Sequence, residues 1–378
     1  MSSNILTVEL VGGVKIPLVG LGTYDARDDV MKKVIKDAID AGYRHFDTAD
    51  FYKVSFYFYF FIYFWILFVK VRFFFQNIGP LGESLLECIS EGKVKREDIF
   101  IVTKVWPTWF SSGRPELSVR KQLKESGLDY FDLVLLHWPT PLKDDDVEGF
   151  PVDPDTNKVV VLDRSLNDIY ADLENVQEKG LTKAIGLSNF NHVQIEEILK
   201  TAKIHPTMNQ VEAHVFLNQS KLQRFCEEKK IVLTAYCPLS RGGTRKSTDS
   251  VIDNPTLSAI GQPKGKSAAQ VALRYLVQRN FVVIPKTVSS DRMKANIDLF
   301  DFELSPEEMK QIDGLNKNHR EIKFEYFGMN EHPQYPFHLE YWRAISLSLF
   351  FLSFKQSFKK CQTFFFNQNT KKKIILRK

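Results

Sequence analysis

The chain has 378 residues, of which 44% are hydrophobic and 26% are charged, proportions typical of a globular protein with a large core. Its net charge of +5 is uneven, because nine Lys and Arg residues lie in 342–378 and two in 54–76, and the rest carries about −6. This mildly acidic body excludes a general nucleic-acid-binding surface. The four Cys are widely spaced and form no CxxC pair, and the N-terminal sequence does not resemble a signal peptide, so a reduced, cytoplasmic location is expected.

Short apolar runs of strand type alternate with helical patterns from residue 16 to about residue 300. Each run is compact and ends in small or polar residues, as expected for strands that are buried on both faces. The runs cover residues 16–23, 45–49, 100–105, 132–138, 184–190, 208–214, 231–237 and 281–287.

The segments between these runs place apolar residues at i, i+3 and i+4 and finish at Gly or Lys, which predicts helices. They include residues 28–43, 114–128, 165–180 and 220–230, and a further helix is predicted to begin after Ser305, with Pro306 in its first turn. Eight strands that are each followed by a helix predict an α/β fold, a closed parallel (β/α)₈ TIM barrel rather than an open doubly wound sheet. Before the barrel, residues 7–17 predict a β-hairpin with a Gly-Gly turn that closes its lower end.

Polar and titratable side chains gather where the predicted strands end. They are Asp47, Lys104, His137, Ser188, Asn189, Gln210, Tyr236 and Lys286. Because a (β/α)₈ barrel carries its chemistry at the carboxyl ends of its strands, these residues predict an active site on one rim.

Seven motifs in order give the chain a resemblance to the aldo-keto reductase superfamily, in particular to its aldose and aldehyde reductase branch. They are GYRHFDTADFY (42–52), FIVTKVWPT (100–108), DLVLLHWP (132–139), AIGLSNF (184–190), MNQVEAH (208–214), TAYCPL (234–239) and IPKTVSSDRMKAN (284–296). The resemblance covers about residues 5–53 and 77–341. It implies NADPH-dependent reduction of an aldehyde or ketone, such as an aldose or an aromatic or aliphatic aldehyde, to an alcohol by hydride transfer.

The resemblance implies a catalytic tetrad of Asp47, Tyr52, Lys104 and His137. Hydride addition to a carbonyl leaves an alkoxide that needs a proton, and a tyrosine with a pKa near 10 is a reluctant donor at neutral pH. A neighbouring Lys104 ammonium favours the phenolate and so lowers the pKa of Tyr52, while Asp47 keeps the lysine charged. His137 would donate a hydrogen bond to the substrate oxygen.

The family's cofactor pocket maps onto two groups of residues. For the nicotinamide half, the resemblance implies Gly22, Thr23, Asp47, Ser188, Asn189, Gln210, Tyr236 and Leu239, and for the adenosine half Lys286, Thr287, Val288, Ser289, Arg292 and Asn296. Two cations beside two hydroxyl groups suit a phosphate dianion, which favours NADP(H) over NAD(H). The chain departs from the family at Ala295, where Glu or Gln is frequent, and at Arg241, where a small Ser is frequent.

The expected substrate pocket is lined by Tyr24, Trp106, His137 and Trp138, and it suits apolar or sugar-like carbonyl compounds. Each aromatic ring could equally belong to the core. Family specificity lies in the loops after Trp138 and after Asn316, so the C-terminal loop is expected to contact the substrate, whose identity stays open. No metal is expected, because the eight His show no ligand spacing, and Gly20-Leu21-Gly22 lacks the third glycine of a dinucleotide-binding fingerprint.

Two segments interrupt this pattern and together hold 16 of the 31 Phe residues. Residues 54–76 form an apolar insert in a barrel domain that spans 1–341, and residues 342–378 form a basic, Phe-rich tail outside the fold. A membrane span is disfavoured, because 54–69 gives only 16 uncharged residues where about 20 are needed. Translated intron is the preferred interpretation, since removal of 54–76 restores the family spacing between Tyr52 and Asn77.

Three functional readings follow: a working reductase, a barrel that serves as a binding or regulatory subunit, and an inactive product of a faulty gene model. The four tetrad residues favour the first reading. In that case the expected partner is a small carbonyl substrate, with no nucleic acid or membrane, and the expected oligomeric state is a monomer.

Overall fold

The computed structural model describes residues 6–24, 26, 28–50, 53–59, 70–143, 149–240 and 250–339. The chain divides into one compact unit, Met1–Pro336, and a second, Phe337–Lys378, of which only residues 337–339 are described. The predicted tail 342–378 therefore lies outside the described residues, as do Tyr52 and Arg241. The fold is that of the first unit.

Eight parallel strands form the central sheet, and each overlaps one of the predicted runs. In chain order they are β3 (Leu21–Gly22), β4 (His45–Asp47), β7 (Phe100–Val105), β8 (Phe131–Leu136), β9 (Thr182–Ser188), β10 (Met208–Glu212), β11 (Val232–Tyr236) and β12 (Val282–Val283). Their order in the sheet, β12-β11-β10-β9-β8-β7-β4-β3, is that of the sequence, so every strand pairs with its neighbour along the chain.

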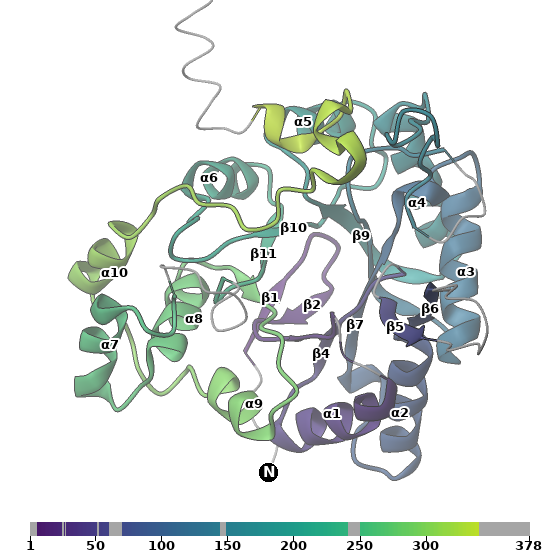
Figure 1. Cartoon of the computed structure of the whole chain (residues 1–378). Coiled ribbons are helices and arrows are strands. Elements are labelled where there is room, and N and C mark those ends of the chain that lie inside the picture. The colour runs from purple at the N-terminus through teal and green to yellow at the C-terminus, as the bar shows by residue number, and fades with distance from the viewer. Residues whose placement is uncertain are drawn as a thin grey trace, which may run out of the picture. The chain divides into compact units, whose positions relative to one another are not determined.

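The sheet closes on itself between its first and last strands. Parallel bridges join Val19 to Val283 and Gly22 to Lys286, and the amide of Gly20 donates to the Val283 carbonyl at 2.8 Å. Figure 1 shows the labelled barrel strands curving around the N-terminal hairpin, with helices outside them. The predicted (β/α)₈ barrel is confirmed.

A helix follows each barrel strand and covers its outer face. These helices are α1 (Asp28–Ala41), α2 (Ile78–Ser90), α3 (Arg114–Ser126), α4 (Leu166–Glu178), α5 (His192–Leu199), α6 (Ser220–Glu228), α8 (Ala268–Gln278) and α9 (Ser290–Ile297). Additional helices are α7 (Pro255–Gly261), α10 (Pro306–Asp313) and the 3₁₀ turns Arg96–Asp98, Pro107–Trp109, Gln262–Lys264, Tyr326–Glu331 and Pro336–Leu339. The predicted start of α10 is confirmed, because the Ser305 hydroxyl accepts a hydrogen bond from the Glu308 amide at 3.2 Å.

The N-terminal hairpin closes one end of the barrel, as predicted. β1 (Thr7–Glu9) pairs antiparallel with β2 (Lys15–Pro17) across a turn in which Gly12 and Gly13 have φ angles of 94° and 82°. Leu10 and Ile16 from the hairpin are buried in a cluster with barrel-strand residues, most of them in the amino-terminal halves of their strands, namely Phe100, Val102, Leu133, Leu135, Ala184, Met208 and Val282. The opposite rim, at the strands' carboxyl ends, is left for a site.

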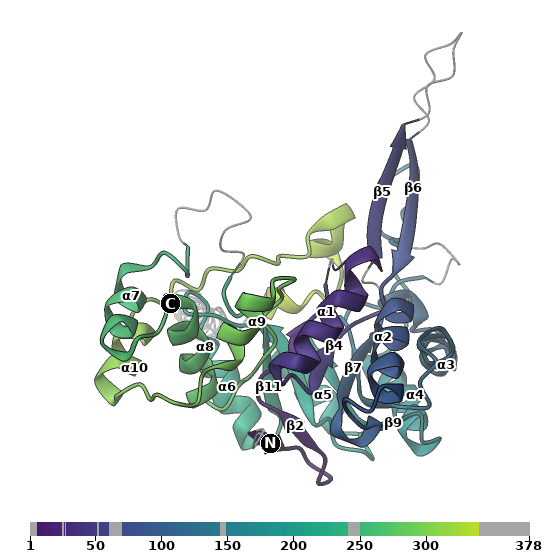
Figure 2. The ribbon, with the colours of Figure 1, turned by 90° about the horizontal axis from the view of Figure 1, so that it is seen from below.

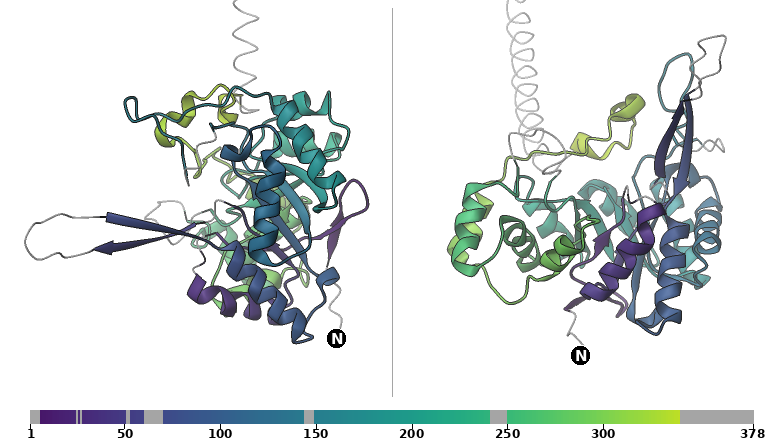
Figure 3. Two further views of the ribbon diagram at one scale, coloured as in Figure 1. Left: turned by 90° about the vertical axis from the view of Figure 1, so that its right-hand side faces the viewer. Right: turned by 60° about the horizontal axis from the view of Figure 1, so that its bottom comes forward.

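The inserted segment contributes a sheet of its own. β5 (Lys53–Tyr59) and β6 (Lys70–Gln76) pair antiparallel, from Lys53 opposite Gln76 to Tyr59 opposite Lys70. Figures 2 and 3 show this two-stranded ribbon, which shares no ladder with the barrel sheet. Across the described ranges, no helix has the length and apolar character required to cross a bilayer.

Directly after the insert, the chain is fixed in the barrel. Asn77 is fully buried, and its side chain contacts Thr48 and Thr23. Five residues later, Gly82 lies so close to α3 that an added Cβ atom would stand 2.1 Å from the Ser126 carbonyl oxygen. The residues that follow the insert are therefore packed against the barrel and against α3, as those of a barrel helix should be.

We expect a variant that lacks residues 54–76 to fold into the same barrel. Lys53 and Gln76 face each other in the ladder, a relation that brings Cα atoms to about 5 Å, whereas one peptide link spans about 3.8 Å. Asn77 directly follows Gln76, so joining Lys53 to Asn77 needs only a local adjustment of the backbone at the junction. Circular dichroism and thermal unfolding of both proteins test this, and loss of the cooperative transition in the shortened chain would contradict it.

Candidate active site

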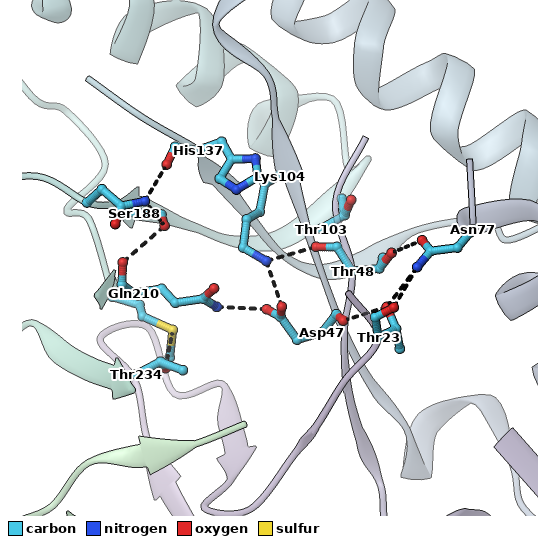
Figure 4. Close-up of polar contacts among 12 residues, drawn as sticks. Thr23, Asp47, Thr48, Asn77, Thr103, Lys104, His137, Ser188, Gln210 and Thr234 are labelled. Carbon is cyan, nitrogen blue, oxygen red and sulfur yellow. Dashed lines mark hydrogen bonds and ion pairs between the residues drawn. The ribbon is translucent and has the colours of Figure 1, made fainter. Parts of the chain in front are cut away.

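A buried ion pair lies at the carboxyl ends of two neighbouring strands. Asp47 ends β4 and Lys104 lies near the end of β7, and their exposed fractions are 1% and 0%. Lys104 Nζ donates to Asp47 Oδ1 at 2.7 Å and to the Thr48 carbonyl at 2.9 Å (Figure 4). Burial lowers the pKa of Lys104 from its ordinary value, while the Asp47 charge opposes this shift. The lysine is thus an ammonium group with few hydration partners and one close anion.

Both carboxylate oxygens of Asp47 are used. Gln210 reaches across from β10 and donates its Nε2 to Asp47 Oδ2 at 2.7 Å. The main-chain carbonyl of Asp47 accepts from the Thr23 amide at 3.0 Å and from the Thr23 hydroxyl at 2.9 Å. The sequence predicted both Gln210 and Thr23 for the cofactor pocket, and the structure adds that they fix Asp47.

His137 lies on the next strand end after Lys104 and is buried as a neutral ring. Its amide donates to the Val105 carbonyl, and its own carbonyl accepts from Asn189 Nδ2, both at 3.0 Å. Burial, and secondarily the Lys104 charge, holds the pKa of His137 well below its ordinary value. At neutral pH this imidazole can donate a hydrogen bond, but it carries no extra proton to transfer.

The residues predicted for the nicotinamide form one connected polar band. Tyr236 Oη donates to Asn189 Oδ1 at 2.7 Å, Asn189 Nδ2 donates to Ser188 Oγ at 3.1 Å, and Ser188 Oγ donates to the Gln210 carbonyl at 3.0 Å. Asn189 has a φ angle of 64°, a left-handed conformation that asparagine tolerates better than most residues. Leu239 is half-buried three residues after Tyr236. The band joins the Asp47–Lys104 pair through Gln210.

The predicted proton donor, Tyr52, lies outside the described residues, but the chain just before it is placed. Asp50 is buried, and its amide donates to the Lys104 carbonyl at 3.4 Å. Thr48 Oγ1 donates to Asn77 Oδ1 at 2.9 Å, and Asn77 Nδ2 donates to the Thr23 carbonyl at 2.8 Å. Residues 48–50 are therefore held beside Lys104 and Asn77.

The residues predicted for the adenosine phosphate lie together at the start of α9. Thr287 Oγ1 accepts from Arg292 Nε at 3.2 Å and from the Ser289 amide at 3.1 Å. Lys286 and Arg292 are exposed, Val288 is also exposed, and Asn296 is buried on the same helix. Pairing of Gly22 with Lys286 connects this cationic turn to the rim. A helix amino end with two cations is a favourable place for an anion.

A cluster of aromatic rings packs beside His137. The Trp106 ring meets the His137 ring edge-on at 5.2 Å between centroids. Phe324 stacks on Trp138 at 3.9 Å with an angle of 5° between the planes, and Phe150 lies 5.8 Å from Phe324. Trp106 and Trp138 are buried, as a pocket wall or a core would require, whereas Tyr24 has an exposed fraction of 55%.

Phe324 has an unusual backbone conformation. Its φ angle is 55°, and Phe327 three residues later has a φ angle of 51°. Such a left-handed conformation costs a bulky residue about 1–3 kcal/mol, and it persists only where surrounding contacts enforce it. The sequence did not single out Phe324 or Phe150, because aromatic residues in an irregular loop carry no period that would place them.

Comparisons with known proteins agree on one family. Residues 18–317 match the family model described as the aldo/keto reductase family. The mouse (Mus musculus) aldo-keto reductase family 1 member C13 is 38% identical, with 90% of this chain and all of that protein covered. The bovine (Bos taurus) dihydrodiol dehydrogenase 3 is 40% identical, with 88% and 98% covered.

Among solved structures, the aldose reductase of Schistosoma japonicum matches with a TM-score of 0.77 and 32% identity. The match covers 89% of this chain and all of that protein. The predicted family resemblance is therefore confirmed, and the relatives extend beyond enzymes named for aldoses.

We expect Lys104→Met to destabilise the barrel by about 3–5 kcal/mol, because it leaves the Asp47 charge buried without its cation. The double variant Asp47→Asn with Lys104→Met should recover part of this loss, since it removes the unpaired charge as well. Urea unfolding of the single and double variants measures the coupling. Additive effects of the two substitutions would contradict a coupled pair.

Proposed function

This chain belongs to the aldo/keto reductase family, and we propose that it reduces an aldehyde or ketone to an alcohol with a hydride from NADPH. The observation that carries the proposal is the buried Asp47–Lys104 pair at the barrel rim. A buried ammonium is costly for a purely structural purpose, yet it is what a tyrosine acid needs beside it. Neutral His137 on the adjacent strand end supplies a hydrogen-bond donor for the substrate oxygen.

The proposed chemistry needs one proton for each hydride. The cofactor, when bound, supplies the hydride to the carbonyl carbon. Tyr52 gives its phenolic proton to the oxygen that becomes the alcohol, and the Lys104 ammonium stabilises the phenolate that remains. Asp47 keeps Lys104 charged, and Gln210 and Thr23 keep Asp47 in place. We assign His137 to orientation of the carbonyl, because its lowered pKa leaves it neutral.

The residues present fit a phosphorylated dinucleotide. A cationic turn at the start of α9, with Lys286, Arg292 and the Thr287 hydroxyl, would hold the 2′-phosphate of the adenosine. Toward the barrel axis, the side-chain amides of Asn189 and Gln210 and the Ser188 hydroxyl would hold the carboxamide of the nicotinamide, and Tyr236 would stack on its ring. Gly22 has no room for a side chain, because an added Cβ atom would stand 2.9 Å from the Ile284 carbonyl.

The aromatic cluster favours carbonyl compounds with an apolar body. The Trp106 ring packs against His137 and Phe324, and Phe324 stacks on Trp138, so an apolar body bound beside His137 would meet aromatic rings, while the polar rim would bind one substrate oxygen. The names of similar proteins include a dihydrodiol dehydrogenase and an aldose reductase, so both a dihydrodiol and an aldose are named among the relatives. We propose that the protein works as a monomer in the cytoplasm.

We expect Tyr52→Phe to lower kcat by a factor of about 100 to 10,000 with an aromatic aldehyde, because the proton donor is removed. NADPH oxidation should be measured in the full chain and in the variant without residues 54–76. Tyr130→Phe is the matched control, since Tyr130 directly precedes the amino end of β8, at the end of the barrel opposite the candidate site. An unchanged rate in Tyr52→Phe would refute the acid role.

The same assay separates the other readings. Activity only in the shortened chain would identify the full-length chain as an inactive product with a sound active site. Binding of NADPH without turnover in either chain would favour a binding or regulatory barrel.

We expect Arg292→Ala to raise the KM for NADPH about 10- to 100-fold and to leave the KM for NADH nearly unchanged. The guanidinium would lose a charge-assisted contact with a phosphate that only NADPH carries. Lys294→Ala, an exposed cation on the same helix, is the control for a general loss of positive charge. Equal effects of Arg292→Ala on both cofactors would count against the 2′-phosphate assignment.

A further inference from the structure

Glu212, at the end of β10, joins the barrel to the loop of residues 314–325, here named the C-terminal loop. Its exposed fraction is 0%. Oε1 accepts from the Glu321 amide at 2.7 Å, and Oε2 accepts from the Ile322 amide at 2.8 Å. One buried carboxylate thus holds two consecutive main-chain amides of the loop.

His214 completes the environment of this carboxylate. The Phe216 amide donates to His214 Nδ1 at 3.3 Å, so the ring proton belongs on Nε2. His214 Nε2 lies 3.0 Å from Glu212 Oε1 and donates to it. Three hydrogen-bond donors therefore converge on the Glu212 carboxylate, and charge-assisted hydrogen bonds of this kind are strong and directional.

The C-terminal loop is also held by residues that follow β10 and β11. Ser240, which follows β11, donates its hydroxyl to Glu321 Oε1 at 2.7 Å. The amides of Lys317 and His319 both donate to the Phe216 carbonyl at 3.0 Å. In each contact, the partner that belongs to the C-terminal loop lies within eight residues of Phe324 in the sequence. The Phe324 ring stacks on Trp138, which follows His137.

We propose that Glu212 is a positioning residue that latches the C-terminal loop and thereby seats Phe324 as a wall of the substrate pocket. The left-handed backbone of Phe324 needs such an external constraint, and the clasped amides lie two and three residues before it. The part that concerns substrate selection rests on the proposed reductase function. The latch itself does not.

The chain contains a matched control for this carboxylate. Glu174, on α4, is also buried, and its Oε1 accepts from the amides of Lys203 and Ile204 at 2.6 and 2.8 Å. These amides precede the amino end of β10, so they lie at the opposite end of the barrel from the candidate site. Glu174→Gln therefore has the same chemistry as Glu212→Gln without a contact to the pocket.

The first measurement is tryptic cleavage at Lys317, Arg320 and Lys323, followed by mass spectrometry of the folded full-length protein. We expect cleavage at these residues to become about tenfold faster in Glu212→Gln than in Glu174→Gln, the factor that corresponds to one lost charge-assisted hydrogen bond. The glutamine keeps one acceptor oxygen and turns an NH₂ group toward a main-chain amide. Equal cleavage in the two variants would overturn the latch.

The second measurement is steady-state kinetics with an aromatic aldehyde and a short aliphatic aldehyde. We expect Glu212→Gln to raise the KM for the aromatic substrate about tenfold, to change kcat less than about twofold, and to spare the short substrate, because only the larger one reaches Phe324. Equal changes for both substrates would refute the role of the loop in selection.

Two further outcomes are separable. If Glu212→Gln fails to fold, Ser240→Ala removes one contact of the same loop outside the core and should give a smaller increase in the same cleavages; no increase there would overturn the proposal. If neither the full chain nor the variant without residues 54–76 shows turnover, the reductase function fails, and the cleavage experiment still decides the latch.

Discussion

A charge kept away from water organises this barrel rim. The Lys104 ammonium is buried, and it remains tolerable only because Asp47 stands 2.7 Å away and a carbonyl accepts a second hydrogen bond. The carboxylate in turn requires Gln210, which belongs to β10. In the sheet, β7, β8 and β9 separate β4 from β10, so Gln210 reaches Asp47 across the interior of the ring. Closure of the barrel is thus a condition for the electrostatics of its rim.

The barrel and most of its rim could be predicted from the sequence, for a local reason. Strands buried on both faces are continuous apolar runs, and their carboxyl ends must share one rim, so Asp47, Lys104, His137 and Gln210 were brought together by topology alone. The same reasoning placed the Gly-Gly hairpin and the Ser305 cap, whose signals lie within a few residues.

Other important residues depend on contacts between distant segments, which no period reveals. Asn77 supports Thr48 and Thr23, and Phe324 covers Trp138 from a loop almost 190 residues further along the chain. Glu212 had one usable signal, an acidic residue at the end of a strand that is buried along its whole length. Such a residue needs donors from elsewhere, but the sequence does not say that the donors belong to the C-terminal loop.

The base of the β5–β6 ribbon has an engineering consequence. The chain leaves the barrel at Lys53 and returns at Gln76, and these two residues are paired in the ladder. This point of the scaffold is therefore an insertion site whose two ends lie close together. A compact module with neighbouring termini can be grafted there without stretching either flank. A sensor domain inserted at that site would stand a few residues from the Asp47–Lys104 pair, so its folding state could be coupled to turnover.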